Sequence, residues 1–206
     1  MNSDRKRDPE STRHAILDAA EHLFLSKGFA ETSTSEIAGL AGVNKSLIHH
    51  HFGSKDGVWD EIKRRIFSVY HTAQKDLLEN LQSSEELLKT SLISYFQFLA
   101  SRPEFARMMC MMYLADDSSC DDLAHELMHL GVAKIAEAQE GGFLRGDLQP
   151  LHILISFLSL VEHWFLCKDH IIGTHFPEKA AEGDTALDQA YLIDLAKIFF
   201  EGVRAT

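Results

Sequence analysis

The sequence predicts an all-α protein, with a small three-helix N-terminal domain that contains a helix-turn-helix and a larger helical domain after it. Apolar residues recur at three- and four-residue spacing along almost the whole chain, as they do on one face of a helix. No segment alternates polar and apolar residues with the enrichment in β-branched side chains that is typical of a strand. Glycines, prolines and polar runs divide this pattern into about nine helices.

Three short helices are expected in the N-terminal domain, over residues 11–26, 33–41 and 44–51. The second helix opens with a capping-box pattern, in which Ser33 and Glu36 can satisfy each other's backbone amides. Each helix is followed by a glycine that can end it: Gly28, Gly42 and Gly53. These signals together predict three short helices joined by tight turns.

Six longer helical patterns follow in the second domain. They cover residues 55–80, 84–101, 104–115, 119–140, 149–169 and 186–203. We expect the helix over 55–80 to join the two parts, and we therefore predict domains at 1–56 and 57–206. The first domain contains the predicted helix-turn-helix, and the second contains the longer helices.

The composition is that of an ordinary soluble globular protein. The chain has 206 residues, of which 45% are hydrophobic and 25% charged. Its three cysteines, an odd number, are too few for a disulfide framework and fit a reducing compartment. The most apolar stretch, 151–167, contains Glu162 and two histidines, so we expect it to be too short and too polar to span a bilayer. We therefore predict a cytoplasmic protein that does not associate with a membrane.

The charge is unevenly distributed along the chain. The net charge is −11, but residues 1–56 contain 7 Lys/Arg and 8 Asp/Glu, which leaves −10 for residues 57–206. An acidic second domain can help to orient a DNA-binding protein by repelling DNA from the wrong face. The basic cluster Arg5-Lys6-Arg7 can be read either as a minor-groove arm or as a solvated tail. The charge permits DNA binding without indicating it.

A helix-turn-helix needs two short helices, a tight turn and a small residue where the helices touch. Ala38 supplies the small residue, and 41–43 (Ala-Gly-Val) supplies the turn. Six apolar side chains are expected to seal the interior: Leu23, Phe24, Ile37, Leu40, Val43 and Ile48. The outer face of the third helix then presents side chains that can reach phosphates and base edges: Lys45, Ser46, Leu47, His49 and His50.

From Ala15 to Lys55 the chain resembles the DNA-binding head of the TetR family of transcriptional regulators. The matching elements occur in order, and they are Ala19-Ala20 with Leu23-Phe24, Gly28-Phe29, Thr32-Ser33, Ile37-Ala38, Ala41-Gly42-Val43, His51-Phe52 and Lys55. An ordered set over about 40 residues is far more specific than a lone helix-turn-helix pattern. The rest of the chain is similar only in length, helical content and the turn at 142–145.

The resemblance implies that residues 1–56 bind DNA and that residues 57–206 hold an effector and a dimer interface. It also implies which residues meet DNA. Phosphate and base contacts are implied for Ser33, Thr34 and Ser35, base readout for Lys45, Ser46 and Leu47, and phosphate contacts for His49, His51 and Lys55. We add His50 to this set as an exposed neighbour.

Two residues depart from the family pattern. His49 stands where a tyrosine is usual, so its reach is shorter and its charge depends on pH. Gly57 replaces a common acidic residue, which is expected to weaken the cap of the helix that starts near Lys55.

A competing motif lies at 125–129, where His125-Glu126-Leu127-Met128-His129 matches the zinc-protease pattern HExxH. No third ligand follows at the usual spacing, and Glu137 and Glu140 lie too near on the same helix to close a tetrahedral site. We therefore predict no bound metal, no cofactor and no catalytic residues. A metal-responsive regulator of the same fold, using His125, His129 or Cys120, is kept as an alternative, as is a zinc-dependent hydrolase.

The methionine-rich segment 104–115 suggests an effector pocket, because flexible thioethers suit adaptable cavities. The other interpretation is that these methionines fill a helical core. The candidate pocket residues are Phe96, Met108, Met109, Met112, Tyr113, His163 and Trp164. The family resemblance implies a small hydrophobic effector that releases the protein from DNA, with His163 or Arg107 as polar anchors.

The last two long helices are apolar over more than one stripe, so they are either deeply buried or shared with a partner. The resemblance implies a homodimer that pairs two helices per subunit in a four-helix bundle. The candidate interface residues are Leu154, Leu158, Val161, Phe165, Tyr191, Leu195 and Phe199. A two-fold dimer would act as a repressor on a palindromic operator in double-stranded DNA.

Overall fold

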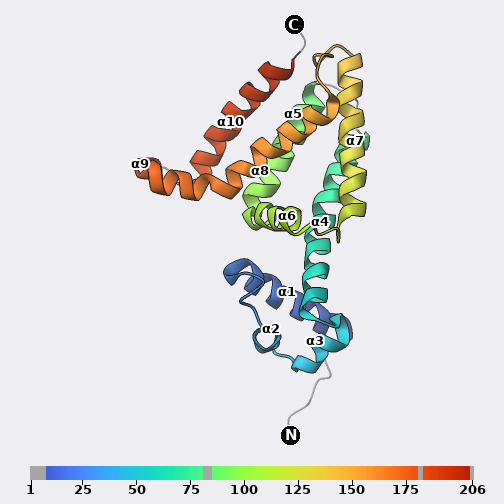
Figure 1. Ribbon diagram of the computed structural model, residues 1–206, viewed down its shortest axis with the longest axis vertical. Coiled ribbons are helices and arrows are strands. Elements are labelled where there is room, and N and C mark those ends of the chain that lie inside the picture. The colour runs from blue at the N-terminus through green and yellow to red at the C-terminus, as the bar shows by residue number, and fades with distance from the viewer. Residues whose placement is uncertain (1–7, 81–84, 181–182, 205–206) are drawn as a thin grey trace. The chain divides into compact units, whose positions relative to one another are not determined.

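The computed structural model describes residues 8–80, 85–180 and 183–204, and within these ranges it contains ten helices and no strand (Figure 1). The all-α prediction is confirmed. The tenth helix beyond the nine expected is a single turn, α9 (Pro177–Ala180), in a stretch predicted to be irregular. The chain separates into two compact units, with the division between Ile66 and Phe67.

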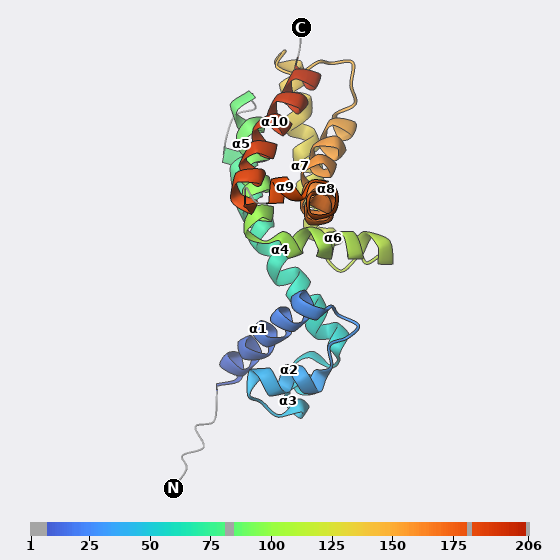
Figure 2. The same ribbon diagram turned by 90° about the vertical axis from the view of Figure 1, so that its left-hand side faces the viewer.

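The first unit consists of α1 (Pro9–Lys27), α2 (Thr34–Ala41), α3 (Lys45–Phe52) and the first turns of α4 (Lys55–Asn80). The three short helices pack on one another, with α2 against both α1 and α3 (Figure 2). Their core is formed by side chains that are fully or almost fully buried: Ile16, Ala20, Phe24, Ile37, Ala38, Ile48, Val58 and Ile62.

One residue expected in this core lies outside it. Leu40 is 55% exposed, whereas Ile37, Ala38 and Ala41 on the same helix are buried. Because successive helical residues are about 100° apart, Leu40 falls outside the stripe that these three define. Trp59 of α4 packs instead against Phe24, with ring centroids 5.2 Å apart.

The second unit contains the rest of α4 together with six further helices. They are α5 (Glu85–Ser101), α6 (Pro103–Ala115), α7 (Asp121–Glu140), α8 (Pro150–His175), α9 and α10 (Asp184–Val203). α8 packs against α5, α6, α7 and α10. A core cluster joins four of these helices and the turn at Leu144 through Leu92, Ile135, Ala138, Ile153, Phe199 and Phe200.

The turn at 142–145 closes one end of this unit. The amides of Phe143 and Leu144 donate to the carbonyl of Ala138, and the Arg145 amide donates to the carbonyl of Val203 in α10. An isolated bridge joins Leu144 to Arg204. The turn therefore connects the end of α7 to the end of α10.

The apolar helix α8 is longer than the sequence suggested. It runs for 26 residues to His175, so the expectation that this segment is too short to span a bilayer was wrong on length. By length and composition alone, α8 could cross a membrane. In the structure, however, Val161 and Phe165 are buried, and Lys168 forms an ion pair with Asp188 of α10 at 2.8 Å. These contacts attach α8 to the other helices of the second unit.

The division at Ile66 lies ten residues beyond the boundary expected from the sequence, because Val58, Ile62 and Ile66 of α4 are buried in the first unit. The assignment of functions to residues 1–56 and 57–206 remains a prediction.

Candidate DNA-binding site

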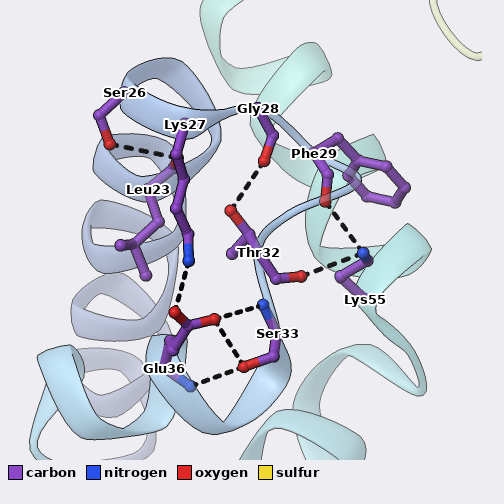
Figure 3. Close-up of polar contacts among 9 residues, drawn as sticks. All are labelled: Leu23, Ser26, Lys27, Gly28, Phe29, Thr32, Ser33, Glu36 and Lys55. Carbon is purple, nitrogen blue, oxygen red and sulfur yellow. Dashed lines mark hydrogen bonds and ion pairs between the residues drawn. The ribbon is translucent and has the colours of Figure 1, made fainter.

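The connection between α1 and α2 is fixed by two polar side chains (Figure 3). The Thr32 hydroxyl donates to the carbonyl oxygen of Gly28 at 2.8 Å. The Lys55 ammonium donates to the carbonyls of Phe29 and Thr32 at 2.9 and 3.0 Å, and it lies 4.2 Å from the centroid of the Phe29 ring. Lys55 thus ties this connection to the start of α4.

The start of α2 is a complete capping box, as the sequence predicted. The Ser33 hydroxyl accepts from the Glu36 amide at 3.2 Å, and the Glu36 carboxylate accepts from the Ser33 amide at 2.8 Å. The Glu36 carboxylate also forms an ion pair with Lys27. Hydrogen bonds from Lys27 and Ser33 lower the pKa of Glu36 to about 2, so this cap is ionised at neutral pH.

The turn between α2 and α3 has the geometry that its sequence predicts. Gly42 ends α2 in the left-handed conformation, with a φ of 64°, which a glycine adopts without steric cost. The Val43 amide returns to the Ala38 carbonyl at 3.0 Å. Ala38 itself is buried where α2 meets the rest of the unit.

α3 is held by its first residues and by one apolar side chain. The Asn44 side-chain oxygen caps the helix by accepting from the Ser46 amide at 3.0 Å. Ile48 is fully buried. Four of the predicted contact residues, Lys45, Ser46, His49 and His50, are exposed, while Leu47 and His51 are half-buried. α3 therefore presents one polar face that carries two imidazoles and an ammonium.

His49 makes an internal hydrogen bond that restricts its protonation. Its Nδ1 lies 3.0 Å from the carbonyl oxygen of Gly53, so Nδ1 must carry the proton. Nε2 can then donate to a phosphate only when the ring is an imidazolium. A tyrosine hydroxyl at this position would have no such requirement.

The start of α4 corrects the expectation for Gly57. A Cβ at this position would lie 2.1 Å from the carbonyl oxygen of Phe52, so the backbones approach too closely for any other residue. The Gly57 amide donates a hydrogen bond to the Ser54 hydroxyl at 3.0 Å, so Ser54 caps this first turn. The close approach of the two backbones therefore requires a glycine at position 57, where the family usually has an acidic residue.

The predicted DNA contacts divide into two groups. The side chains of Ser33 and Lys55 are already used inside the unit, whereas Thr34 and Ser35 form no side-chain hydrogen bond with any described residue. The DNA contacts themselves remain predictions. The cluster Arg5-Lys6-Arg7 lies outside the described residues.

Sequence reasoning missed two features of this site. The cap at Asn44 had a signal, because Asn is a favoured residue directly before a helix. The contact of Lys55 with the carbonyls of Phe29 and Thr32 had none, because those residues are 26 and 23 positions away in the sequence.

The HExxH motif gathers no further metal ligand among the residues that the structure describes. His125 and His129 are exposed, with ring centroids 4.2 Å apart. Across residues 8–80, 85–180 and 183–204, no three His, Cys, Asp or Glu side chains gather as metal ligands would. Glu126 is ion-paired with Lys75 and lies 2.7 Å from Nε2 of His71, so it is not poised as a general base.

A cavity lies within the second unit, between α4, α5, α6, α7, α8 and α10. Its volume is about 120 Å³. The lining is mainly apolar and aromatic, and it includes Phe67, Tyr70, Tyr95, Phe105, Phe157 and Leu158. Its polar groups are few, and the charged ones are Glu162 and Lys134.

Only part of the predicted pocket lines this cavity. Met109 and Tyr113 do so, as do Leu154, Leu158 and Phe199, which we had assigned to a dimer interface. Phe96, Met108 and Met112 are buried in the core, and Trp164 stacks on Tyr191 at 4.1 Å and donates to Asp188. His163 lies beside Cys167, and Arg107 is exposed near Asp169. These residues do not line the cavity because they point from other faces of the same helices.

The predicted dimer residues also need correction. Val161, Phe165, Leu195 and Phe199 are buried inside one chain, so they leave almost no surface for a partner. Tyr191 is half-buried and donates to the carbonyl of Leu160. The apolar residues that α8 and α10 do expose are not among the predicted interface residues. They are Leu151, Ile155, Leu160, Ile171, Ile193 and Ile198.

Three features together define a helix-turn-helix DNA-binding protein: the buried side chains that hold α1, α2 and α3 together, the tight turn between α2 and α3, and the exposed polar face of α3. The family model described as bacterial regulatory proteins, tetR family, matches residues 16–62, which covers the whole of this motif. The resemblance of the N-terminal domain to the DNA-binding head of TetR-family transcriptional regulators is thereby confirmed.

Similarity to known regulators extends over the full length. The chain is 22% identical over 199 residues to the HTH-type transcriptional repressor NicS of Pseudomonas putida, covering 93% of each protein. It is 26% identical over 211 residues to the transcriptional regulator RutR of Escherichia coli, covering 97% of this chain and 94% of RutR. The crystal structure of AibR, solved with isovaleryl coenzyme A and operator DNA, superposes with a TM-score of 0.72 at 17% identity, covering 92% of this chain and 98% of AibR.

Proposed function

We propose that this protein is a homodimeric, ligand-responsive repressor that binds a palindromic operator in the cytoplasm and is released by a small, largely apolar effector. The observation that carries the proposal is the polar face of α3, where Lys45, Ser46, His49 and His50 are exposed above a fully buried Ile48. A rigid helix with such a face can enter a major groove. The name of NicS as a repressor, and the AibR complex with DNA, support this role over an enzymatic one.

The cavity of the second unit supports the response to a ligand. Small-molecule sites are concave and mostly apolar, with a few polar groups that orient the ligand. The cavity has this character, with rings from five helices and two charged side chains in its lining. AibR binds isovaleryl coenzyme A, which shows that a protein of this fold can hold a small molecule.

The exposed apolar side chains of α8 and α10 support the dimer. Ile193 and Ile198 are 57% and 69% exposed, and Leu151, Ile155 and Leu160 of α8 are also exposed. Apolar side chains gathered on two helices of a soluble domain are typical of a protein interface. A two-fold dimer carries two recognition helices, so we expect an inverted repeat in its operator.

The test of DNA recognition is selection of bound duplexes from a random pool by the full-length chain. We expect a palindrome to be enriched, and recovery of unrelated sequences would contradict the proposal. His50→Ala should relax the selected sequence at one position in each half-site. His22→Ala is the matched control, because His22 is an exposed histidine on α1, away from the face of α3.

The dimer is tested by sedimentation equilibrium. Ile193→Asp should yield monomers that bind the operator much more weakly, because a buried unpaired charge is costly. Ile93→Asp is the control, since Ile93 is 40% exposed on α5. If Ile193→Asp remains dimeric, α10 is not at the interface.

A further inference from the structure

A carboxylate lies in the wall of the apolar cavity without a cation beside it. Glu162 of α8 is half-buried and lines the cavity. Its Oε1 accepts a hydrogen bond from the Tyr95 hydroxyl at 2.6 Å. Among the described residues, none donates to Oε2 and no Lys, Arg or His forms an ion pair with Glu162. One carboxylate oxygen therefore remains available to a ligand.

Aromatic rings surround this carboxylate. Tyr70 lies 5.1 Å from Tyr95 and 5.9 Å from Phe105 between ring centroids, and Tyr95 stacks on Phe157 at 6.0 Å. All four rings line the cavity, and the exposed Tyr113 lies in its lining as well. The faces of aromatic rings attract cations, most strongly where water is excluded.

The other charged group of the lining is already paired. The Lys134 ammonium donates to the Glu137 carboxylate at 3.1 Å. Burial raises the pKa of Glu162, and the hydrogen bond from Tyr95 opposes this shift. The carboxylate in the empty cavity therefore lacks the counter-charge that would stabilise its ionised form.

We propose that the cavity selects lipophilic organic cations, with Glu162 as the counter-ion and the tyrosine and phenylalanine rings as the wall that covers the apolar part of the ligand. The inference rests on the proposed function, because it names the chemical class of the effector. A positive nitrogen would replace the missing counter-charge, while an anionic ligand such as an acyl carboxylate would meet repulsion from Glu162. A neutral ligand would gain only the apolar contact.

The test compares three probes that share one apolar body. They are (4-phenylbutyl)trimethylammonium, its neutral isostere in which carbon replaces nitrogen, and 5-phenylpentanoate. Calorimetric titration of the full-length protein at neutral pH should give at least about tenfold tighter binding of the cation than of the isostere, with the anion weakest. The same order should hold for release of the operator.

Two variants assign the preference to Glu162. Glu162→Gln keeps an acceptor for Tyr95 and should reduce the preference for the cation to within about twofold, with the affinity for the isostere unchanged. Glu201→Gln removes a negative charge from an exposed site on α10 and should leave the preference intact. Unchanged thermal unfolding of Glu162→Gln would show that the variant is folded.

The pH dependence provides a second readout. The affinity for the permanent cation should fall as the pH drops through the raised pKa of Glu162, because the protonated carboxyl no longer carries a charge. The affinity for the isostere should not change. The other titratable groups of the lining are Lys134 and three tyrosines, Tyr70, Tyr95 and Tyr113, and burial raises the pKa of each of these tyrosines further above this range.

Equal binding of cation and isostere, or a preference that survives Glu162→Gln, overturns the inference. If the isostere nevertheless releases the operator, the proposed function stands and only the class of effector is wrong. If none of the probes binds, the inference fails, and operator binding then supports only the DNA-binding part of the proposed function.

Discussion

The two units of this chain organise their sites in different ways. In the head, residues 8–66, the site is fixed by hydrogen bonds to backbone groups, mostly between residues close in sequence, as in the capping box of Ser33 and Glu36. In the body, residues 67–204, the cavity is lined by rings from five helices that are far apart in sequence. The head can therefore present a fixed surface to a regular partner such as DNA, whereas the body provides a lined space whose shape depends on many side chains.

The two units also differ in whether their charged side chains have partners. In the head, Glu36 forms an ion pair with Lys27, and Lys55 donates hydrogen bonds to backbone carbonyls. The body retains Glu162 in an apolar wall without a cationic partner among the residues described. The Glu162 variants test the cavity side of this contrast, and the four predictions below test the head side.

The largest effect is expected at Ile48, which is fully buried beneath the exposed face of α3. Ile48→Ala should cost about 2–5 kcal/mol of unfolding free energy, because it leaves a cavity in a small core. Operator binding should be lost with it. Chemical denaturation and a DNA-binding titration measure the two effects.

Leu40→Ala is the control for Ile48. Leu40 is 55% exposed on α2, so the same kind of truncation should change stability by less than about 0.5 kcal/mol. Equal losses of unfolding free energy for Ile48→Ala and Leu40→Ala would contradict the burial of Ile48 beneath the exposed face of α3.

The next effect is expected at Lys55, where the structure changes the expectation drawn from the sequence. Lys55→Met should destabilise the head by about 1–3 kcal/mol, because it leaves the carbonyls of Phe29 and Thr32 without their donor. A residue that contacts only a phosphate would alter the salt dependence of DNA binding without affecting stability. Thermal unfolding in the absence of DNA separates the two roles.

A comparable but smaller effect is expected at Gly57. Gly57→Ala should cost about 1–2 kcal/mol, since its Cβ would meet the Phe52 carbonyl and the backbone must shift. Gly39→Ala is the matched control, because nothing lies within 4 Å of its Cβ. Alanine is favoured over glycine inside a helix, so Gly39→Ala should stabilise the protein by about 0.5–1 kcal/mol. A stabilised Gly57→Ala variant would argue against the close approach.

The smallest effect concerns the pH dependence of the Glu36 cap. Because hydrogen bonding in the folded state lowers the pKa of Glu36 from 4.5 to about 2, its contribution to stability is present above pH 4.5. The contribution should be lost progressively as the pH falls from 4.5 towards 2. The difference in stability between the natural chain and Glu36→Gln should shrink over this range, and a constant difference would show that the charge of Glu36 has no part in the cap.

The contrast also explains how far the sequence could be interpreted. The helices of the head, its turn and the Ser33–Glu36 cap were predicted residue by residue, because capping and turn formation depend on neighbours within four positions. In the body, the all-α class was predicted, but Met108, Met112 and His163, which we predict for an effector pocket, do not line this cavity, whereas Glu162 lines it and was not predicted. Helical periodicity indicates that a helix has apolar faces, and it does not indicate which face meets a cavity and which meets the core.

The separation of roles within the head has an evolutionary consequence. Lys45 and His50 form no hydrogen bond or ion pair within the part of the chain that the structure describes, whereas Thr32, Asn44 and Lys55 maintain the architecture. Substitutions at the first two positions can therefore accumulate at little cost in stability. A lineage of such proteins can acquire new operators after gene duplication while it retains the same head.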